Sequence, residues 1–323
     1  MRRVWCIAIA MAGLAGCAGP AEAPASPAEF AVLHTVSPVT TFAIAKTGAL
    51  AATLSQDHRL RIVSMPDGAE RRAIDLGDRA VDVFALSPDG LLVAIGDHKG
   101  AVSVWDTTTG QSRLELQLAH YPGLGVFSHN GAILAVAAQG DPVQLIDIAS
   151  GRPAATLGAP TGGTMALAFS RDDRLVTTAD GDAAVRIHDA HTGTRIAENR
   201  DFLLVPLAVD FTADGASVIA GGGDKVVLFI DASNGQTIRK MDRTAQPVAF
   251  LEVSPDGASF GTAFMKSENM TLPDRIVVWA SKTGQQEAEW LPQSLPAGAG
   301  WTRDGRLIVA IAAADGVHLW RVR

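Results

Sequence analysis

The sequence predicts an all-β fold made of seven repeats of one four-stranded antiparallel unit. The first observation behind this prediction is a recurring tetrad of Ser or Thr, a variable residue, Asp or Asn, and Gly, with a divergent first copy and Asp173 in place of Gly in the fourth. The copies end at residues 48, 90, 131, 173, 215, 257 and 305, in steps of 42, 41, 42, 42, 42 and 48. A fixed period of this size is the signature of a repeat architecture. The tetrads are Ala45–Gly48, Ser87–Gly90, Ser128–Gly131, Ser170–Asp173, Thr212–Gly215, Ser254–Gly257 and Thr302–Gly305.

The second observation is the strand pattern within one repeat. Residues 80–87 are nearly all apolar, 91–96 are apolar, 101–106 alternate around Val102 and Val104, and 111–118 alternate polar and apolar residues. Turn-forming residues separate these four segments. Short strands at this spacing indicate an antiparallel meander, with a half-solvated last strand at the outer edge.

The third strand of the repeat carries a motif that recurs along the chain. It is complete as Trp105-Asp106 and partial elsewhere, and in this pattern residues 30–323 resemble the WD40 family. The resemblance implies a β-propeller whose third strands end in Trp-Asp. The partial copies keep the aromatic residue at Trp279 and Trp320, or the acid at Asp147, Asp189 and Asp231.

Seven copies then predict a seven-bladed β-propeller of four-stranded antiparallel blades. The last repeat supplies three strands, and residues 30–36 (FAVLHTV) offer the fourth. Pairing of this N-terminal strand with the last blade would close the ring and remove exposed sheet edges. We expect a monomeric propeller over residues 30–323.

The Gly-His dipeptide of the WD40 family is missing from the repeats. We therefore do not expect the family's hydrogen-bond network between that His and an Asp in the turn before the third strand. Asp57, Asp182 and Asp224 lie at this turn, and we expect them to act as turn formers.

The N-terminus reads as an export signal. Arg2 and Arg3 precede a short apolar segment, which predicts a signal peptide over residues 1–16. Leu14-Ala15-Gly16-Cys17 resembles the lipobox of bacterial lipoproteins, and this implies cleavage before Cys17 and lipidation of that residue. An ordinary signal peptide with an incidental Cys is the alternative. Residues 17–29 then form the lipidated Cys and a Pro/Ala-rich tether.

The resemblance to lipoproteins also sets an expected location. It implies a lipid-anchored, periplasm-facing protein of the bacterial cell envelope. Because Ala18 is not the aspartate that the family associates with inner-membrane retention, the outer membrane is favoured. The mature chain would have no Cys pair for a disulfide.

Three short motifs have simpler structural explanations. Lys282-Thr283-Gly284 matches a β-lactamase box, but the repeat places a hairpin turn there. Gly221-Gly222-Gly223 precedes no helix, so we expect a tight turn rather than a phosphate loop. His188 and His191 have no second ligand pair in the sequence. We expect no metal site, no catalytic residue and no cofactor.

The single irregular repeat suggests where a partner binds. Its six extra residues fall between the second and third strands, within 265–274, and such insertions often lie on a binding face. Family topology puts this loop on the same face as the connections between blades, which include Phe202-Leu203-Leu204. The alternative is an ordinary surface excursion with Phe202 and Leu204 packed between blades. The candidate partner-binding residues are Met265, Lys266, Glu268, Met270, Leu272, His120, Tyr121 and Arg243.

Together these features favour a membrane-anchored, non-enzymatic platform for a protein partner in the cell envelope. An enzyme on the same scaffold, such as a quinoprotein-like dehydrogenase or a lactonase-like hydrolase, is the alternative, because a fold does not fix a function. A glycan-binding module is disfavoured by the single tyrosine and few tryptophans. Nucleic acid is not an expected partner, since the net charge is −7 and no basic run follows Arg3.

Overall fold

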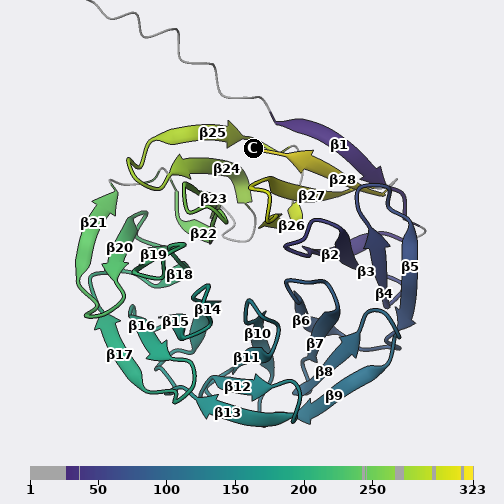
Figure 1. The fold of residues 1–323 in the computed structure, drawn as a ribbon, viewed down its shortest axis with the longest axis horizontal. Coiled ribbons are helices and arrows are strands. Elements are labelled where there is room, and N and C mark those ends of the chain that lie inside the picture. Colours follow the sequence, from purple (N-terminus) through teal and green to yellow (C-terminus); the bar gives the residue numbers. More distant parts are fainter. Residues whose placement is uncertain are drawn as a thin grey trace, which may run out of the picture.

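The computed structural model is a closed ring of seven four-stranded antiparallel sheets around a central axis (Figure 1). It describes residues 27–35, 37–241, 244, 246–265, 273–292, 296–313 and 316–322. The predicted seven-bladed propeller is confirmed. Within these ranges, no helix long and apolar enough to cross a membrane is found.

The chain builds the blades in order. Blade 1 contains β2 (Val39–Ile44), β3 (Leu50–Ser55), β4 (Arg59–Ser64) and β5 (Glu70–Asp75). Blade 2 contains β6 (Val81–Leu86), β7 (Leu92–Asp97), β8 (Ala101–Asp106) and β9 (Ser112–Gln117). Blade 3 contains β10 (Pro122–Phe127), β11 (Ile133–Ala138), β12 (Gln144–Asp147) and β13 (Arg152–Thr156). Blade 4 contains β14 (Thr164–Phe169), β15 (Leu175–Asp180), β16 (Val185–Asp189) and β17 (Arg195–Asn199).

The remaining blades follow the same plan. Blade 5 contains β18 (Pro206–Phe211), β19 (Ser217–Gly222), β20 (Val227–Asp231) and β21 (Thr237–Met241). Blade 6 contains β22 (Val248–Val253), β23 (Ser259–Met265), β24 (Pro273–Ala280) and β25 (Gln286–Trp290). Blade 7 contains β26 (Pro296–Trp301), β27 (Leu307–Ala313), β28 (Gly316–Arg321) and, as its outer strand, β1 (Ala28–Leu33).

The ring has two different ends, because consecutive antiparallel strands turn at alternate ends of a blade. One end holds the turns between first and second strands and between third and fourth strands; we call it the turn end. The other holds the turns between second and third strands and the links between blades; we call it the connection end. The recurring tetrads lie at the turn end.

The N-terminal strand closes the ring, as predicted. In Figure 1 the purple β1 lies along the yellow β28, and the two pair from Ala28↔Arg321 to Leu33↔Val317. The strand runs over 28–33, so the predicted bounds of 30–36 were wrong at both ends. Pairing begins at Ala28, within the segment expected to be tether, and a bulge follows between Glu29 and Ala31. The ring is therefore held by a contact between residues at opposite ends of the described chain.

The core is divided among the spaces between blades. Seven clusters of buried apolar residues are found among the described residues, and each joins two neighbouring blades. The cluster between blades 4 and 5, for example, contains Ile187 of blade 4 together with Val209 and Leu228 of blade 5. Since each blade buries its faces only against its neighbours, the ring has to be complete to be fully packed.

The tetrads recur because three of their four positions hold the turn. In the Ser87–Gly90 copy, Ser87 Oγ donates to Asp89 Oδ1 at 2.6 Å and accepts from the Leu92 N–H at 2.9 Å. Gly90 adopts a φ of +80°, which favours glycine. The second position has no such role and is free to vary.

Two glycine-containing motifs have clear structural explanations. Gly284 has a φ of +72° and donates its N–H to Ala280 O, which confirms the hairpin turn at Lys282-Thr283-Gly284. The triple glycine was only partly predicted, because Gly221 and Gly222 end β19 and only Gly223 lies in the turn. A Cβ on Gly221 would lie 2.8 Å from the Val248 side chain, so the neighbouring blade leaves no room for one.

Candidate functional site

The connection end exposes large apolar side chains. Of the eight that are exposed among the described residues, four lie in links between blades. Tyr121 follows blade 2, Leu203 and Leu204 follow blade 4, and Leu291 follows blade 6. Their exposed fractions are 41% for Tyr121, 88% for Leu203, 55% for Leu204 and 60% for Leu291. Exposed aromatic and aliphatic groups on a rigid frame can form the centre of a protein interface.

The link between blades 4 and 5 is anchored while its leucines stay exposed. Phe202 is buried at 4% exposure among residues of both blades. The Leu203 N–H donates to Asp224 Oδ2 at 3.1 Å. The alternative interpretation from sequence was thus right for Phe202 and wrong for Leu204, which is exposed. The backbone is fixed, and Leu203 and Leu204 are free to contact another molecule.

His120 and Tyr121 lie in the link between blades 2 and 3. His120 Nδ1 is 2.9 Å from Asp141 Oδ1, and Asp141 belongs to the β11–β12 turn at the same end. The Tyr121 carbonyl accepts the Gln139 N–H at 3.1 Å. This link is therefore tied to blade 3 and presents a phenol ring and an imidazole to solvent.

Most of the other candidate residues fall outside the described part of the chain. Met265 is the last residue of β23, and Pro273 begins β24, so these strands extend into the predicted insertion. The rest of the predicted insertion, residues 266–272, lies outside the described residues. Lys266, Glu268, Met270, Leu272, Arg243 and Cys17 lie outside the described residues.

Asp57, Asp182 and Asp224 lie in the turns before the third strands. Asp57 receives a two-pronged contact from the Arg61 guanidinium, with Nη1 3.0 Å from Oδ1, and this hydrogen bonding lowers the pKa of Asp57. Asp182 receives the equivalent contact from Arg186. These two turns pair Asp with an Arg four residues later. Asp224 instead binds the link between blades through Leu203.

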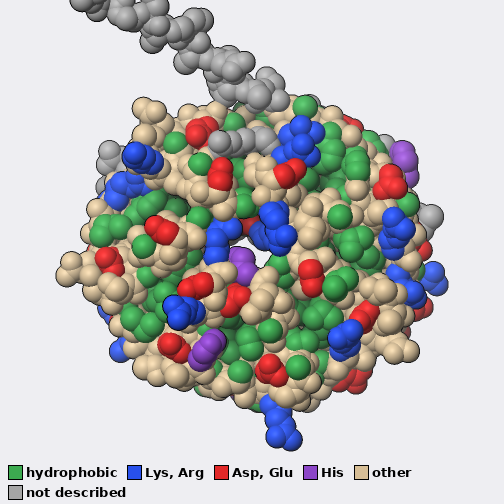
Figure 2. All heavy atoms as spheres, viewed as in Figure 1, with side chains coloured by type: hydrophobic (Ala, Val, Ile, Leu, Met, Phe, Trp, Pro, Cys, Tyr) green, Lys and Arg blue, Asp and Glu red, His purple; other side chains and the backbone are tan. Residues whose placement is uncertain are grey.

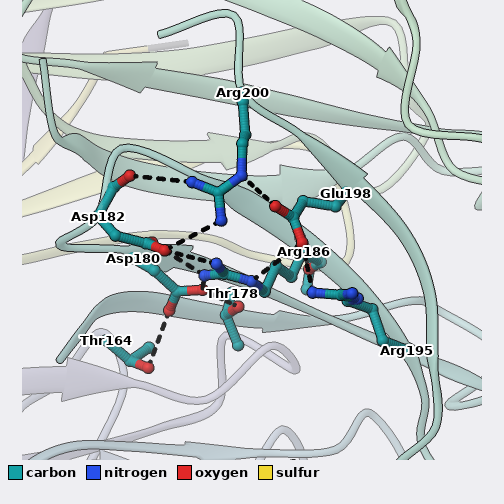
Figure 3. Close-up of polar contacts among 9 residues, drawn as sticks. Thr164, Thr178, Asp180, Asp182, Arg186, Arg195, Glu198 and Arg200 are labelled. Atoms are coloured by element: carbon teal, nitrogen blue, oxygen red, sulfur yellow. Dashed lines mark hydrogen bonds and ion pairs between the residues drawn. The ribbon is translucent and has the colours of Figure 1, made fainter. Parts of the chain in front are cut away.

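The Asp182–Arg186 pair belongs to a larger network on blade 4 (Figure 3). Arg186 Nη1 is 2.7 Å from Asp180 Oδ2, and Asp180 also accepts hydrogen bonds from Thr164 and Thr178. Figure 3 shows Glu198 between Arg195 and Arg200, with both of which it forms ion pairs. Three arginines balance three carboxylates here, so the network stabilises the blade and has no excess charge to offer a ligand.

His188 is a buried core residue. It is 3% exposed, and burial, reinforced by the nearby Arg186 and Arg195, lowers its pKa to about 4. The imidazole is therefore neutral near neutral pH. His191 lies in the following turn, where its N–H donates to Asp189 Oδ1 at 2.9 Å. No group of three His, Cys, Asp or Glu side chains suited to a metal occurs among the residues described.

Sequence reasoning missed the charged side chains inside the ring. Figure 2, seen down the axis, shows basic and His side chains around the central opening. The cavity there is lined by Lys46, His129, Arg171, Asp210, Glu252 and Arg303, among other residues. The signal was present in the tetrads: Lys46, His129, Arg171 and Arg303 all occupy the variable second position.

Comparison with known proteins agrees with the fold. Residues 151–189 match the family model described as WD domain, G-beta repeat. This segment runs from β13 to β16, so the sequence repeat is offset by one strand from the blade. The same offset leaves β1 to complete blade 7. The chain is a seven-bladed β-propeller that contains a WD40 repeat.

Two curated proteins illustrate the similarity. The WD repeat-containing protein SL1-17 of Schistosoma mansoni is 26% identical over 151 residues, which are 46% of this chain and 50% of that protein. Cell division cycle 20.1, cofactor of APC complex, of Arabidopsis thaliana is 20% identical over 283 residues, which are 83% of this chain and 60% of that protein. The matches thus span half to three fifths of the length of these relatives.

Proposed function

We propose that this chain is a non-enzymatic protein-interaction platform whose partner docks on the connection end of the ring. Similarity to WD-repeat proteins supports the class of function. The relative from Arabidopsis thaliana is named as a cofactor of a complex, which favours a role within a protein assembly.

The observation that carries the proposal is the exposure of Leu203 and Leu204. The link buries Phe202 between the blades but presents both leucines to solvent, from a backbone that is hydrogen-bonded to Asp224. Because the backbone that carries the leucines is already anchored, a partner that covers them orders little additional backbone on the propeller. Tyr121 and Leu291 extend the apolar surface of the same end.

Quantitative crosslinking in the native cell envelope tests this proposal. The variant Leu203→Asp with Leu204→Asp should lose its crosslinked partners, with affinity reduced by at least about tenfold, as expected for a hot spot. The matched control is Leu91→Asp, because Leu91 is 48% exposed but lies in the β6–β7 turn at the turn end. Equal partner lists for both variants would contradict the proposal. Deletion of residues 266–272 then asks whether the insertion contributes to the same interface.

We further propose that the platform is a lipoprotein of a bacterial cell envelope, anchored through Cys17 and facing the periplasm. The support is the order of charged, apolar and small residues before Cys17. Two or more acyl chains would hold the ring firmly, since each buried methylene contributes roughly 0.8 kcal/mol. We favour the outer membrane because Ala18 follows the cysteine.

Metabolic labelling with a radioactive fatty acid tests the anchor. The wild-type chain should incorporate label and sediment with membranes, whereas Cys17→Ala should do neither. Label retained by Cys17→Ala would overturn the assignment of Cys17 while leaving the platform proposal to its own test.

A further inference from the structure

The turn end of the ring contains a cavity that the interaction platform does not use. It has a volume of about 370 Å³ and opens around the central axis. Cavities of roughly 300–1,000 Å³ are typical of small-molecule sites. Six of its lining residues are second-position residues of the seven tetrads: Lys46, Pro88, His129, Arg171, Pro255 and Arg303.

The repeat shows which of these charges are additions to the fold. Pro88 and Pro255 show that the second position needs no charge to form the turn. Asp210 and Glu252 stand two residues before their tetrads, at a slot that Ala, Val or Gly fills in the other five blades. The charges of the cavity are therefore not required by the blade pattern.

The two acids have structural partners. Asp210 Oδ2 accepts the Val253 N–H at 2.7 Å and so joins blade 5 to blade 6. Glu252 Oε2 accepts the Trp301 N–H at 3.3 Å and joins blade 6 to blade 7. Glu252 also forms an ion pair with Lys46. Both acids are thus engaged with protein groups.

Arg171 and Arg303 have capacity left for a ligand. Arg171 Nη2 donates to Ser254 O at 2.8 Å, which fixes the guanidinium across the channel, while its Nε is buried without a hydrogen-bond partner. Arg303 is held at its backbone, where its N–H donates to Lys46 O at 2.5 Å. Its guanidinium is exposed and forms no hydrogen bond or ion pair with any residue that the structure describes. Two arginines therefore line one cavity, and neither has a carboxylate partner within the described part of the chain.

His129, which lines the same cavity, is held in place by an unusual residue. Asp173 takes the place of the tetrad glycine and has a φ of +59°. Its carboxylate accepts the N–H groups of His129 and Asn130 at 2.6 and 3.0 Å. A non-glycine residue in this conformation is strained, and here it fixes the neighbouring turn that carries His129.

We propose that this cavity binds a small molecule bearing a phosphate group, with Arg171 and Arg303 contacting the phosphate and His129 and Lys46 beside it. Arg171, Arg303, His129 and Lys46 come from four different blades and approach the axis from different sides. A tetrahedral dianion can receive donors from several directions, whereas a planar carboxylate is satisfied by one arginine. The apolar wall formed by Val126, Leu167 and Leu251 leaves room for a short organic body.

Isothermal titration calorimetry of the full chain tests this site with glycerol 3-phosphate, inorganic phosphate and citrate. Wild type should bind one equivalent of glycerol 3-phosphate. Arg171→Gln with Arg303→Gln should weaken binding at least tenfold, and Arg303→Gln alone should weaken it several-fold. The matched control is Arg174→Gln, which removes an exposed arginine from the same turn as Arg171 but outside the cavity. It should change the affinity by less than twofold.

Three results would overturn the proposal. Wild type could fail to bind either phosphate at concentrations of about 10 mM, which corresponds to less than roughly 3 kcal/mol of binding free energy. The double variant could bind as well as wild type does. Citrate could bind more tightly than both phosphates, and the ligand would then be a polycarboxylate. Thermal unfolding of each variant checks that the ring is intact. Because Arg303 is exposed, Arg303→Gln should disturb folding least.

Discussion

The turn end and the connection end of this propeller follow opposite rules. At the turn end, the hydrogen bond from the first to the third tetrad residue recurs in six blades, and six of the seven variable second residues line the axial cavity. At the connection end, the links differ in sequence from one blade to the next and expose apolar side chains such as Leu203. In a repeat fold of this kind, the constant positions maintain stability, whereas the departures from the repeat show where function is added.

The largest expected effect concerns the closure that holds both ends together. Deletion of residues 28–33 removes β1 from blade 7, exposes the edge of β28 and uncovers the cluster around Leu33. The deleted chain should aggregate, because an open ring leaves an unpaired sheet edge and an unpacked blade. Size-exclusion chromatography and urea unfolding measure this. A soluble deletion product that still unfolds cooperatively would show that the ring is stable without β1.

A pair of single substitutions sharpens the comparison between the ends. Ser87→Ala removes a buried hydroxyl at the turn end and leaves the Leu92 N–H without its acceptor. It should lower the free energy of unfolding by about 1–3 kcal/mol. Leu203→Ser at the connection end should change it by less than about 0.5 kcal/mol, because the side chain is exposed. Urea denaturation monitored by circular dichroism measures both, and equal losses would contradict a stabilising role confined to the turn end.

A smaller effect is expected from pH on ligand binding in the cavity at the turn end. Burial lowers the pKa of Lys46 to about 8, despite the attraction of Asp210, and Arg171 lowers it further. A bound anion is attracted to Lys46 only while the Lys46 side chain is protonated. The affinity for the anion should therefore be full below this pKa and fall as the pH rises through it. The groups around Lys46 are Asp210, Glu252, His129, Arg171 and Arg303. Sulfate is a suitable probe, since its charge stays constant from about pH 7 to 9.5.

The expected change is a several-fold loss of sulfate affinity over this range, measured by calorimetry. Lys46→Gln should bind more weakly and show a flat profile. A wild-type profile as flat as that of Lys46→Gln would exclude Lys46 from the ligand site, while the Arg171 and Arg303 variants would still test the site itself.

The sequence was sufficient for the ring because the tetrads set both its period and its turns. It was also sufficient for the closure, although pairing with β28 moved the strand from 30–36 to 28–33. Gly221 and Gly222 were placed in a turn because their close neighbours, Val248 of the next blade and the Val205-Pro206 backbone, are not visible along one chain. The charged cavity at the turn end was not predicted, for a similar reason. Lys46, Arg171 and Arg303 lie far apart in sequence, and only ring closure brings them to one cavity.

The exposed leucines show the same limit. Periodicity alone does not separate the buried Phe202 from the exposed Leu203 and Leu204, because all three are apolar and lie in one irregular link. Their exposure depends on how the link crosses between two blades.

The most direct test of the account compares the two ends in the living cell. A photo-reactive amino acid is placed at position 203 on the connection end and, in a second chain, at position 91 on the turn end. Both positions carry an exposed leucine, so the two probes differ mainly in the end they report. We expect position 203 to give a discrete crosslinked protein and position 91 to give none. Crosslinking of one protein at position 91 and not at 203, or equally at both, would contradict the assignment of the connection end as the partner-binding face.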